Sequence, residues 1–292
     1  MTGRRCGIIT DMRRVLALSV AAVSLALFAE RPAVLFFGAH PDDAEGYAGL
    51  AFLLAKDYDL HVVDLTHGER GLGEEGLKDG STARMRTREE ESACALLGAK
   101  LHFLDEIDGE ACAGKSAAEG LAKILRDAKP VAVFTHWPLD AHPDHMQCAA
   151  LMANAIRLTG VKPEQYFYEV LFSQTRNWNP LYSVDITSVM SNKVGLLRKY
   201  VCQNPDDSIV REKLAQAEQR GRERVPPVRY AETFTTFDGK PWPGVLEKLP
   251  QTVRRLALDL RLDAGQALKS AASHTENFPH TNVAEYGTMS TS

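Results

Sequence analysis

The stretch VLFFGAHPDDAEG, residues 34–46, decides the fold, because an apolar run typical of a buried strand leads directly into HPDD at residues 40–43. The arrangement returns in VAVFTHWPLDAHPDHMQCAA, residues 131–150, where a second apolar run leads to HPDH at residues 142–145. Each His-Pro-Asp tripeptide therefore follows an expected strand and precedes an Ala-containing segment. Two tripeptides in matched positions indicate one shared site.

Strands and helices alternate along the first half of the chain. Short apolar runs predict strands at 33–39, 59–68, 100–106 and 131–137, and helical periodicity predicts helices at 44–56, 81–99, 116–129 and 145–160. Beyond residue 165 the pattern loosens, with added strands expected at 166–174 and 180–188 and helices at 192–203 and 208–224. This alternation predicts an α/β fold: a three-layer, Rossmann-like, mostly parallel sheet with helices on both faces.

One domain with added C-terminal elements accounts for the pattern. We expect this domain to span residues 33–236, followed by a partly helical extension at 237–269. The polar tail 270–292 has the composition of a disordered segment. Residues 1–29 have the character of a signal peptide or a short anchor.

Composition restricts the class of function. With 292 residues and 45% hydrophobic content, the chain can bury a large core. A formal net charge of -4 and a pI near 6.2 argue against nucleic acid as a partner. The five cysteines form no CxxC pair, so they are interpreted as small buried or incidental thiols.

The tripeptides have a spacing that suits a metal site. Proline is favoured at the first helical position, so the residue three after each histidine is expected to lie beside it. His40 can then converge with Asp43, and His142 with His145. Two histidines and a carboxylate, with positions left open for water, form a catalytic metal pattern. A single HPD would more often be a helix cap, but a pair at matched strand ends favours a site.

Taken together, HPDD and HPDH resemble the LmbE-like (PIG-L) superfamily of zinc-dependent N-acetylglucosaminyl deacetylases. Weaker motifs follow in that family's order, namely LTHGERG (65–71), RTREEESACALLGA (86–99), FLDEIDG (103–109) and VDIT (184–187). The resemblance covers roughly residues 33–235. It implies hydrolysis of the N-acetyl group of an N-acetylglucosamine-type sugar or conjugate, with release of acetate.

The resemblance also implies a metal site, in which His40, Asp43 and His145 hold Zn²⁺. A site with nitrogen and oxygen ligands also accepts Fe²⁺ or Co²⁺, because geometry and metal availability decide occupancy.

Further roles follow from the same resemblance. Asp42 is expected to be the general base, and His142 to stabilise or protonate the tetrahedral species. Arg88 and Asp108 match positions that grip the sugar hydroxyls. A surface ion pair with Glu91 is the alternative role for Arg88.

Two other functions use the same residues. A non-haem iron oxygenase also has a two-His-one-carboxylate site, although it has no need of the additional carboxylate of Asp42. A catalytically silent carbohydrate-binding relative would keep the fold alone. The expected partner is a small amino-sugar substrate, and a membrane becomes a partner only if the N-terminal segment is uncleaved; the sequence leaves the oligomeric state open.

The N-terminal segment generates a first prediction. Arg13 and Arg14 precede fifteen uncharged, mostly apolar residues, VLALSVAAVSLALFA at 15–29. This run is shorter than the roughly 20 residues of a membrane span and fits a signal-peptide core, so we expect export. An uncleaved anchor and a first cytoplasmic helix are the alternatives. Intact-mass analysis from the native host should show a mature chain that begins after a residue near 26–29; one that retains residues 16–25 contradicts cleavage.

Overall fold

The computed structural model describes residues 31–255, so the expected leader and polar tail lie outside the described residues. The strands are β1 (Ala33–Gly38), β2 (Asp59–Thr66), β3 (Lys100–Glu106), β4 (Ala132–His136), β5 (Glu164–Tyr168), β6 (Tyr182–Asp185), β7 (Ala231–Thr235) and β8 (Thr252–Arg254). The helices are α2 (Ala48–Leu54), α3 (Glu74–Asp79), α4 (Ser81–Leu97), α5 (Lys115–Ala128), α6 (Pro143–Thr159), α7 (Met190–Leu197), α8 (Ser208–Glu223) and α9 (Val245–Lys248), with short 3-10 helices η1 (Asp43–Gly46) and η2 (Thr187–Val189).

The strands form one sheet in the order β3-β2-β1-β4-β5-β7-β6-β8. The first five strands in this order are parallel, and the last three pair antiparallel. The predicted single-domain α/β fold with a mostly parallel sheet is therefore confirmed. The C-terminal strands extend the same sheet, and β8 lies within the segment expected to be an extension.

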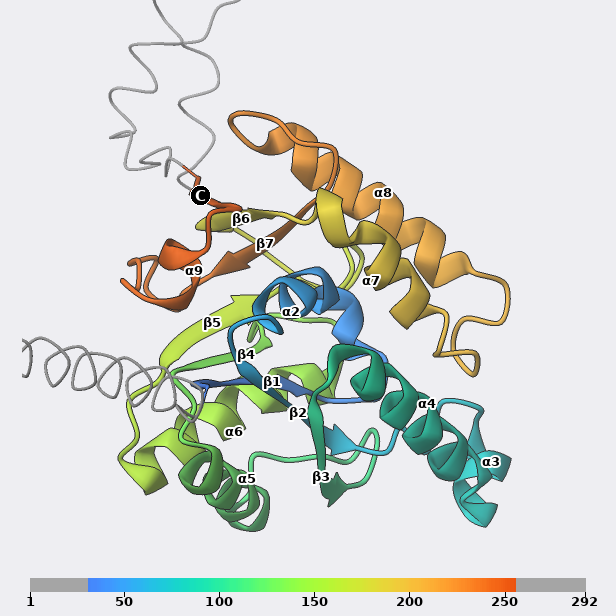
Figure 1. The fold of residues 1–292 in the computed structure, drawn as a ribbon. Coiled ribbons are helices and arrows are strands. Elements are labelled where there is room, and N and C mark those ends of the chain that lie inside the picture. Colours follow the sequence, from blue (N-terminus) through green and yellow to red (C-terminus); the bar gives the residue numbers. More distant parts are fainter. Residues whose placement is uncertain (1–30, 256–292) are drawn as a thin grey trace, which may run out of the picture.

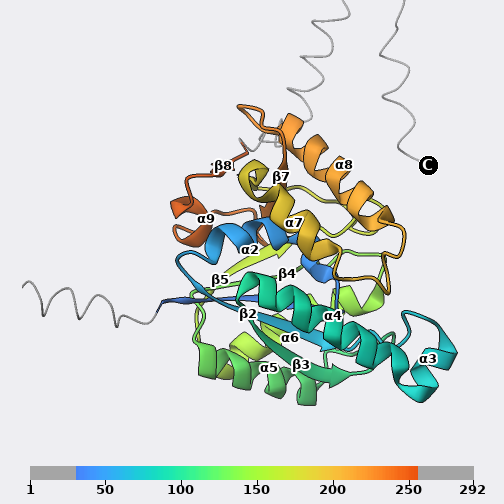
Figure 2. The same ribbon diagram turned by 45° about the vertical axis from the view of Figure 1, so that its right-hand side comes forward.

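Helices cover both faces of the sheet. Helices α2, α4, α7 and α8 lie on one face, whereas α5 and α6 lie on the other (Figures 1 and 2). Successive residues of β1 enter the two cores in turn, because side chains alternate along a strand. Val34 and Phe36 pack in the first core, and Leu35 and Phe37 pack in the second. This double burial explains the continuous apolar run that precedes HPDD.

The two tripeptides meet because β1 and β4 are neighbours. These strands pair in parallel, with Phe37 opposite Thr135 near their carboxyl ends. From β1 the chain winds outward to β2 and β3, and later through β4 to β5 on the other side. The junction of β1 and β4 is thus the point where the winding direction reverses, which is where α/β sheets bind ligands.

Two details of the C-terminal half differ from expectation. The strand expected at 166–174 ends at Tyr168, because the backbone then turns, with the N–H groups of Gln174 and Thr175 donating to Leu171. Strand β7 has the sequence AETFT, with one large apolar side chain, so its pattern does not identify it as a strand. Among the helices of residues 31–255, none combines the length and apolar character needed to cross a membrane.

Candidate active site

A cleft of about 480 Å³ opens at the carboxyl edge of the parallel strands. Every parallel strand is followed by a residue that lines it: Asp43 after β1, Arg70 after β2, Asp108 after β3, His145 after β4 and Val170 after β5. The cleft is therefore the place where the predicted site residues gather.

A larger hollow of about 560 Å³ lies elsewhere, between α6, β5 and residues 236–242. Its lining is mainly apolar, with Met146, Phe167 and Trp242 among the contributors. No residue of the histidine and aspartate cluster lines it, so we place the chemistry in the smaller cleft.

The two tripeptides adopt different local structures. Pro143 begins α6 and His142 is its N-cap, as the sequence predicts. The HPDD segment instead forms a turn that leads into η1, and α2 begins only at Ala48, so the expected helix start at Pro41 is wrong. The turn still places Asp43 beside His40, because the Asp43 N–H donates to the His40 carbonyl at 3.2 Å.

The carboxylate of Asp43 is fixed by three donors to one oxygen. Its Oδ2 lies 2.6 Å from Ala39 N, 2.9 Å from His40 N and 2.8 Å from His136 Nε2. Its Oδ1 lies 3.4 Å from His145 Nε2. Burial alone would raise the pKa of Asp43, but His136 and His145 hold the pKa well below its usual range. Asp43 is therefore an anion with one oxygen still available.

His145 is oriented by a second carboxylate. Its Nδ1 lies 3.0 Å from Asp140 Oδ1, which also accepts from the backbone N–H of His142. The other oxygen of Asp140 accepts from the Thr175 hydroxyl at 3.1 Å. A carboxylate on one ring nitrogen fixes the tautomer and leaves the other nitrogen free to bind a metal. Nε2 of His145 is thus the available atom, and it faces Asp43.

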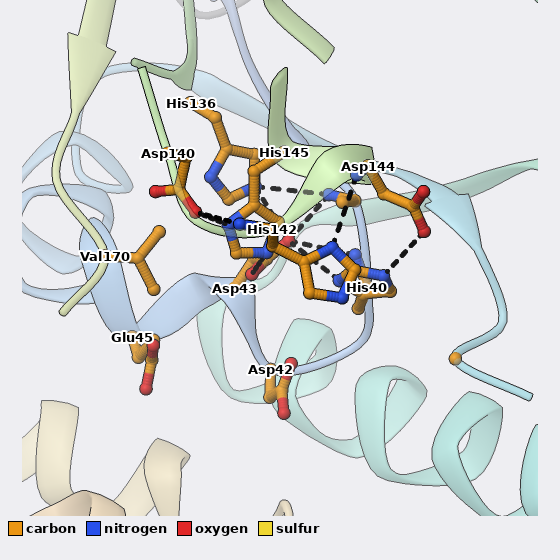
Figure 3. Close-up of polar contacts among 12 residues, drawn as sticks. His40, Asp42, Asp43, Glu45, His136, Asp140, His142, Asp144, His145 and Val170 are labelled. Carbon is orange, nitrogen blue, oxygen red and sulfur yellow. Dashed lines mark hydrogen bonds and ion pairs between the residues drawn. The ribbon is translucent and has the colours of Figure 1, made fainter. Parts of the chain in front are cut away.

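His40 is held in the same way from the opposite side. Its Nε2 lies 3.1 Å from Asp144 Oδ2 (Figure 3). The same nitrogen lies 3.2 Å from Asp108 Oδ1, which leaves Nδ1 toward Asp43. Burial alone would lower the pKa of His40, but the hydrogen bonds that its ring donates to Asp108 and Asp144 raise it to about 10. Three carboxylates thus surround one imidazole, and this excess of negative charge favours a cation.

The residues present fit a divalent metal ion. The orienting hydrogen bonds of the three predicted ligands leave His40 Nδ1, Asp43 Oδ1 and His145 Nε2 for a metal, and such nitrogen and oxygen donors suit zinc. Residues 31–255 contain overlapping groups of side chains whose possible ligand atoms lie within 4.8 Å of one another inside each group. These groups are His40, His142 and His145; His40, Asp108, His142 and Asp144; and Asp43, His136 and His145. The predicted three are divided between two of these groups, because His145 lies with His40 in the first and with Asp43 in the third.

Asp42 points away from the metal donors, toward Arg86. Its φ is 113°, in the left-handed half of backbone space, where a residue other than glycine is strained. Its Oδ1 lies 3.0 Å from Arg86 Nη2. Burial raises the pKa of Asp42, and Arg86 opposes this only in part. Strain of this kind, of order 1–3 kcal/mol, occurs mostly at functional sites.

The prediction that Arg88 lies in the sugar-binding site needs correction. Arg88 is exposed on α4 and lines a separate surface groove with Met85 and Ser92. Arg86, two residues earlier, is buried, lines the cleft and donates to the carbonyls of Pro41 and Gly68. Two residues correspond to a rotation of about 200° around a helix, so both cannot face the same side.

Asp108 and His142 both line the cleft, as expected. Asp108 is already engaged, because its Oδ1 contacts His40 and its Oδ2 accepts from the Arg70 N–H at 3.0 Å. His142 accepts from the Asp144 N–H through Nδ1 at 3.3 Å, which assigns its proton to Nε2. Burial lowers the pKa of His142, so the ring is neutral at pH 7.

Residues of the C-terminal half of the chain hold the helices that follow the HPDD segment in place. Glu232 of β7 accepts from the N–H groups of Gly49 and Leu50 at 2.8 and 2.7 Å, in the first turn of α2. The ammonium group of Lys193 in α7 donates to Glu232 Oε1 at 2.6 Å and to the carbonyl of Glu45 at 2.7 Å, and so links the two residues. A carboxylate at a helix N-terminus stabilises the helix, so elements distant in sequence fix the position of η1.

The sequence analysis misses several residues of the site, among them Asp140 and Arg86. Asp140 stands two residues before His142, in DAHPDH, so a carboxylate next to the second tripeptide was the available signal. Arg86 has no such signal, because neighbouring arginines on a helix cannot be ranked without knowing which face is buried.

We predict opposite outcomes for the two arginines. Arg86→Met should destabilise the fold by about 3–5 kcal/mol, because it leaves the largely buried Asp42 carboxylate and the carbonyls of Pro41 and Gly68 without the guanidinium group. Arg88→Met is the matched control on the exposed face and should change stability by less than about 0.5 kcal/mol. Urea unfolding of the two variants measures both values. Equal effects would contradict the assignment of Arg86 to the site.

Comparisons with known proteins agree with this geometry. Residues 35–156 match the PIG-L family, described as GlcNAc-PI de-N-acetylase. Diacetylchitobiose deacetylase of Thermococcus kodakarensis is 29% identical over 192 residues, which cover 60% of this chain and 71% of that protein. 4-Oxalmesaconate hydratase of Pseudomonas putida is 31% identical over 183 residues, 56% of this chain and 71% of that protein.

A solved structure extends the likeness to three dimensions. The N,N'-diacetylchitobiose deacetylase from Pyrococcus horikoshii has 27% sequence identity and a TM-score of 0.63, with 73% of this chain and 86% of that chain covered. On the shared fold, the matched motifs and these relatives, the chain belongs to the PIG-L (LmbE-like) family.

Proposed function

We propose that this protein is a metal-dependent N-deacetylase that releases acetate from an N-acetylglucosamine-type sugar or conjugate. The observation that carries the proposal is the separation of two adjacent carboxylates. Asp43 is turned inward, toward ring nitrogens of His40 and His145, whereas Asp42 faces the cleft beside Arg86. A ligand set with a neighbouring carboxylate that is not itself a ligand suits hydrolysis. Relatives that are deacetylases support the choice of an amide substrate.

In this proposal His40, Asp43 and His145 hold Zn²⁺, which would polarise the substrate carbonyl and make a water molecule more acidic. Asp42 takes a proton from the attacking water, and its raised pKa makes it a stronger base than an ordinary aspartate. The same carboxyl group then gives the proton to the departing amine as the C–N bond breaks.

His142 acts in this scheme as a hydrogen-bond donor. A neutral ring with its proton on Nε2 can stabilise the negative oxygen that develops on the acetyl carbonyl. A lowered pKa makes His142 a poor source of the proton for the amine, so we assign that step to Asp42. Asp108 remains a candidate for contact with the sugar hydroxyls, and Arg86 takes the place that was predicted for Arg88.

A second candidate reaction is the hydration of an unsaturated acid. It is favoured by the 31% identity with 4-oxalmesaconate hydratase. An activated water and a carboxylate base serve addition to a C=C bond as well as attack on an amide. The two reactions differ in product, because only deacetylation releases acetate and a free amine.

The cellular location of the enzyme depends on the N-terminal segment. We propose that the enzyme works outside the cytoplasm, supported by the signal-length apolar run at 15–29. Amino sugars of envelope or extracellular polymers would then be accessible substrates.

Acetate release provides the first test of the function. The zinc-loaded protein should release acetate from N-acetylglucosamine conjugates such as N,N'-diacetylchitobiose, and a chelator should abolish the reaction until metal is returned. An enzyme-coupled acetate assay and an amine-reactive label measure the two products. Loss of absorbance from an unsaturated dicarboxylic acid, without acetate from any amide, would instead support the hydratase.

The two adjacent carboxylates should have separable effects. Asp42→Asn should keep its metal and fold but lose about 10²–10⁴ in kcat, because a positioned general base contributes that much. Asp43→Asn should weaken metal binding itself, since it loses the anionic oxygen that faces His145. Steady-state kinetics and elemental analysis of both variants decide this. The proposed roles fail if Asp42→Asn is the variant that loses metal.

A further inference from the structure

His136 is a buried histidine that the proposed hydrolysis does not use. It is the last residue of β4, and none of its surface is exposed to solvent. Its ring lies beside His145, on the inner side of the cluster (Figure 3). Burying a polar ring costs free energy unless its nitrogens are hydrogen-bonded. The contacts of this side chain therefore show what it contributes.

The first contact is a hydrogen bond to Asp43. His136 Nε2 lies 2.8 Å from Asp43 Oδ2. Ala39 N lies 3.3 Å from the same ring nitrogen, but it donates at the shorter distance of 2.6 Å to Asp43 Oδ2. An anionic oxygen attracts a donor, so the proton of His136 belongs on Nε2. In the described part of the chain Nδ1 of His136 has no hydrogen-bond partner, which agrees with an unprotonated Nδ1.

The second contact is a stack on His145. The two ring centroids lie 4.0 Å apart with the planes inclined by 12°, so the rings are nearly parallel. Tyr168 packs against His136 as well, with centroids 4.8 Å apart. His145 is therefore restrained both by Asp140 at its Nδ1 edge and by His136 across its face.

From these contacts we propose that His136 is a positioning residue for the metal site. It occupies Asp43 Oδ2, so that only Oδ1 is directed at the metal, and it fixes the plane of His145. This inference rests on the proposed function, in which Asp43 and His145 are ligands. Direct ligation by His136 is the competing role, because His136, Asp43 and His145 also lie within 4.8 Å of one another.

Zinc affinity of the full chain, measured by competition with a chromogenic chelator, separates these roles. His136→Phe keeps a stacking ring but loses the hydrogen bond, and it should weaken zinc binding by about 10–100-fold, the usual effect of removing a partner that orients a ligand. His136→Gln keeps an N–H near the position of Nε2 and should recover at least half of that loss on a logarithmic scale. Wild-type affinity in His136→Phe overturns the proposal. The proposal also fails if His136→Gln binds zinc as weakly as His136→Phe, because that result is expected if His136 is itself a ligand.

Tyr168→Phe is the matched control for a general effect on packing. Tyr168 is fully buried against the same ring and donates its hydroxyl to the Phe37 carbonyl at 3.1 Å, without a hydrogen bond to Asp43 or His145. This variant should lower the thermal unfolding temperature and leave zinc affinity within about twofold of wild type. An equal loss of zinc affinity in Tyr168→Phe would mean that His136 acts only through packing, and would overturn the proposal.

The protonation of His136 can also be measured in the wild-type protein, which does not require His136→Phe to fold. In ¹⁵N-histidine spectra of the zinc-loaded chain, His136 should be a neutral ring with hydrogen on Nε2 and no metal-induced shift. A metal-shifted or unprotonated Nε2 overturns the proposal. Wild-type protein that binds no zinc at all would instead reject the proposed function.

Discussion

The carboxylate of Asp43, held where β1 and β4 end side by side, is the constraint on which the site depends. Two backbone N–H groups and His136 converge on one of its oxygens. Gly38 at the end of β1 permits this, because a Cβ there would lie 3.0 Å from Asp43 Cβ. Parallel pairing of β1 with β4 brings His136 to the required place. The sheet thus supplies both the anion and the donors that make its burial tolerable.

The charges around this carboxylate are arranged for binding a cation rather than for stability. Asp43, Asp108 and Asp144 share the buried neighbourhood of His40, and they raise the pKa of its imidazole. Ion pairs of this kind give weak stabilisation, since desolvation offsets most of the attraction. A divalent metal ion would supply the positive charge that the cluster lacks. Features that oppose local stability concentrate at functional sites, and this cleft follows that rule.

The sequence indicates the positions of the site more reliably than the directions of its side chains. Apolar runs that end in HPDD and HPDH predict neighbouring strand ends, and the structure places both tripeptides there. Which of Arg86 and Arg88 enters the cleft depends on which face of α4 packs on the sheet, and the helix has no clear apolar stripe to show this. Strand β7 escapes prediction for a related reason: its place comes from pairing with β5 and β6 rather than from its own residues.

The different surroundings of Asp42 and Asp43 follow from the backbone. In a regular helix start these neighbours would lie about 100° apart and share much of their surroundings. The positive φ of Asp42 turns the chain sharply before η1, so that Asp43 enters the cluster while Asp42 meets Arg86 in the cleft. Arg86 also donates to the carbonyl of Pro41, so one guanidinium group contacts both the turn and the carboxylate it presents. Because burial raises the pKa of Asp42 and this ion pair opposes the shift only in part, the same turn that strains the backbone gives two chemically alike neighbours different basicity.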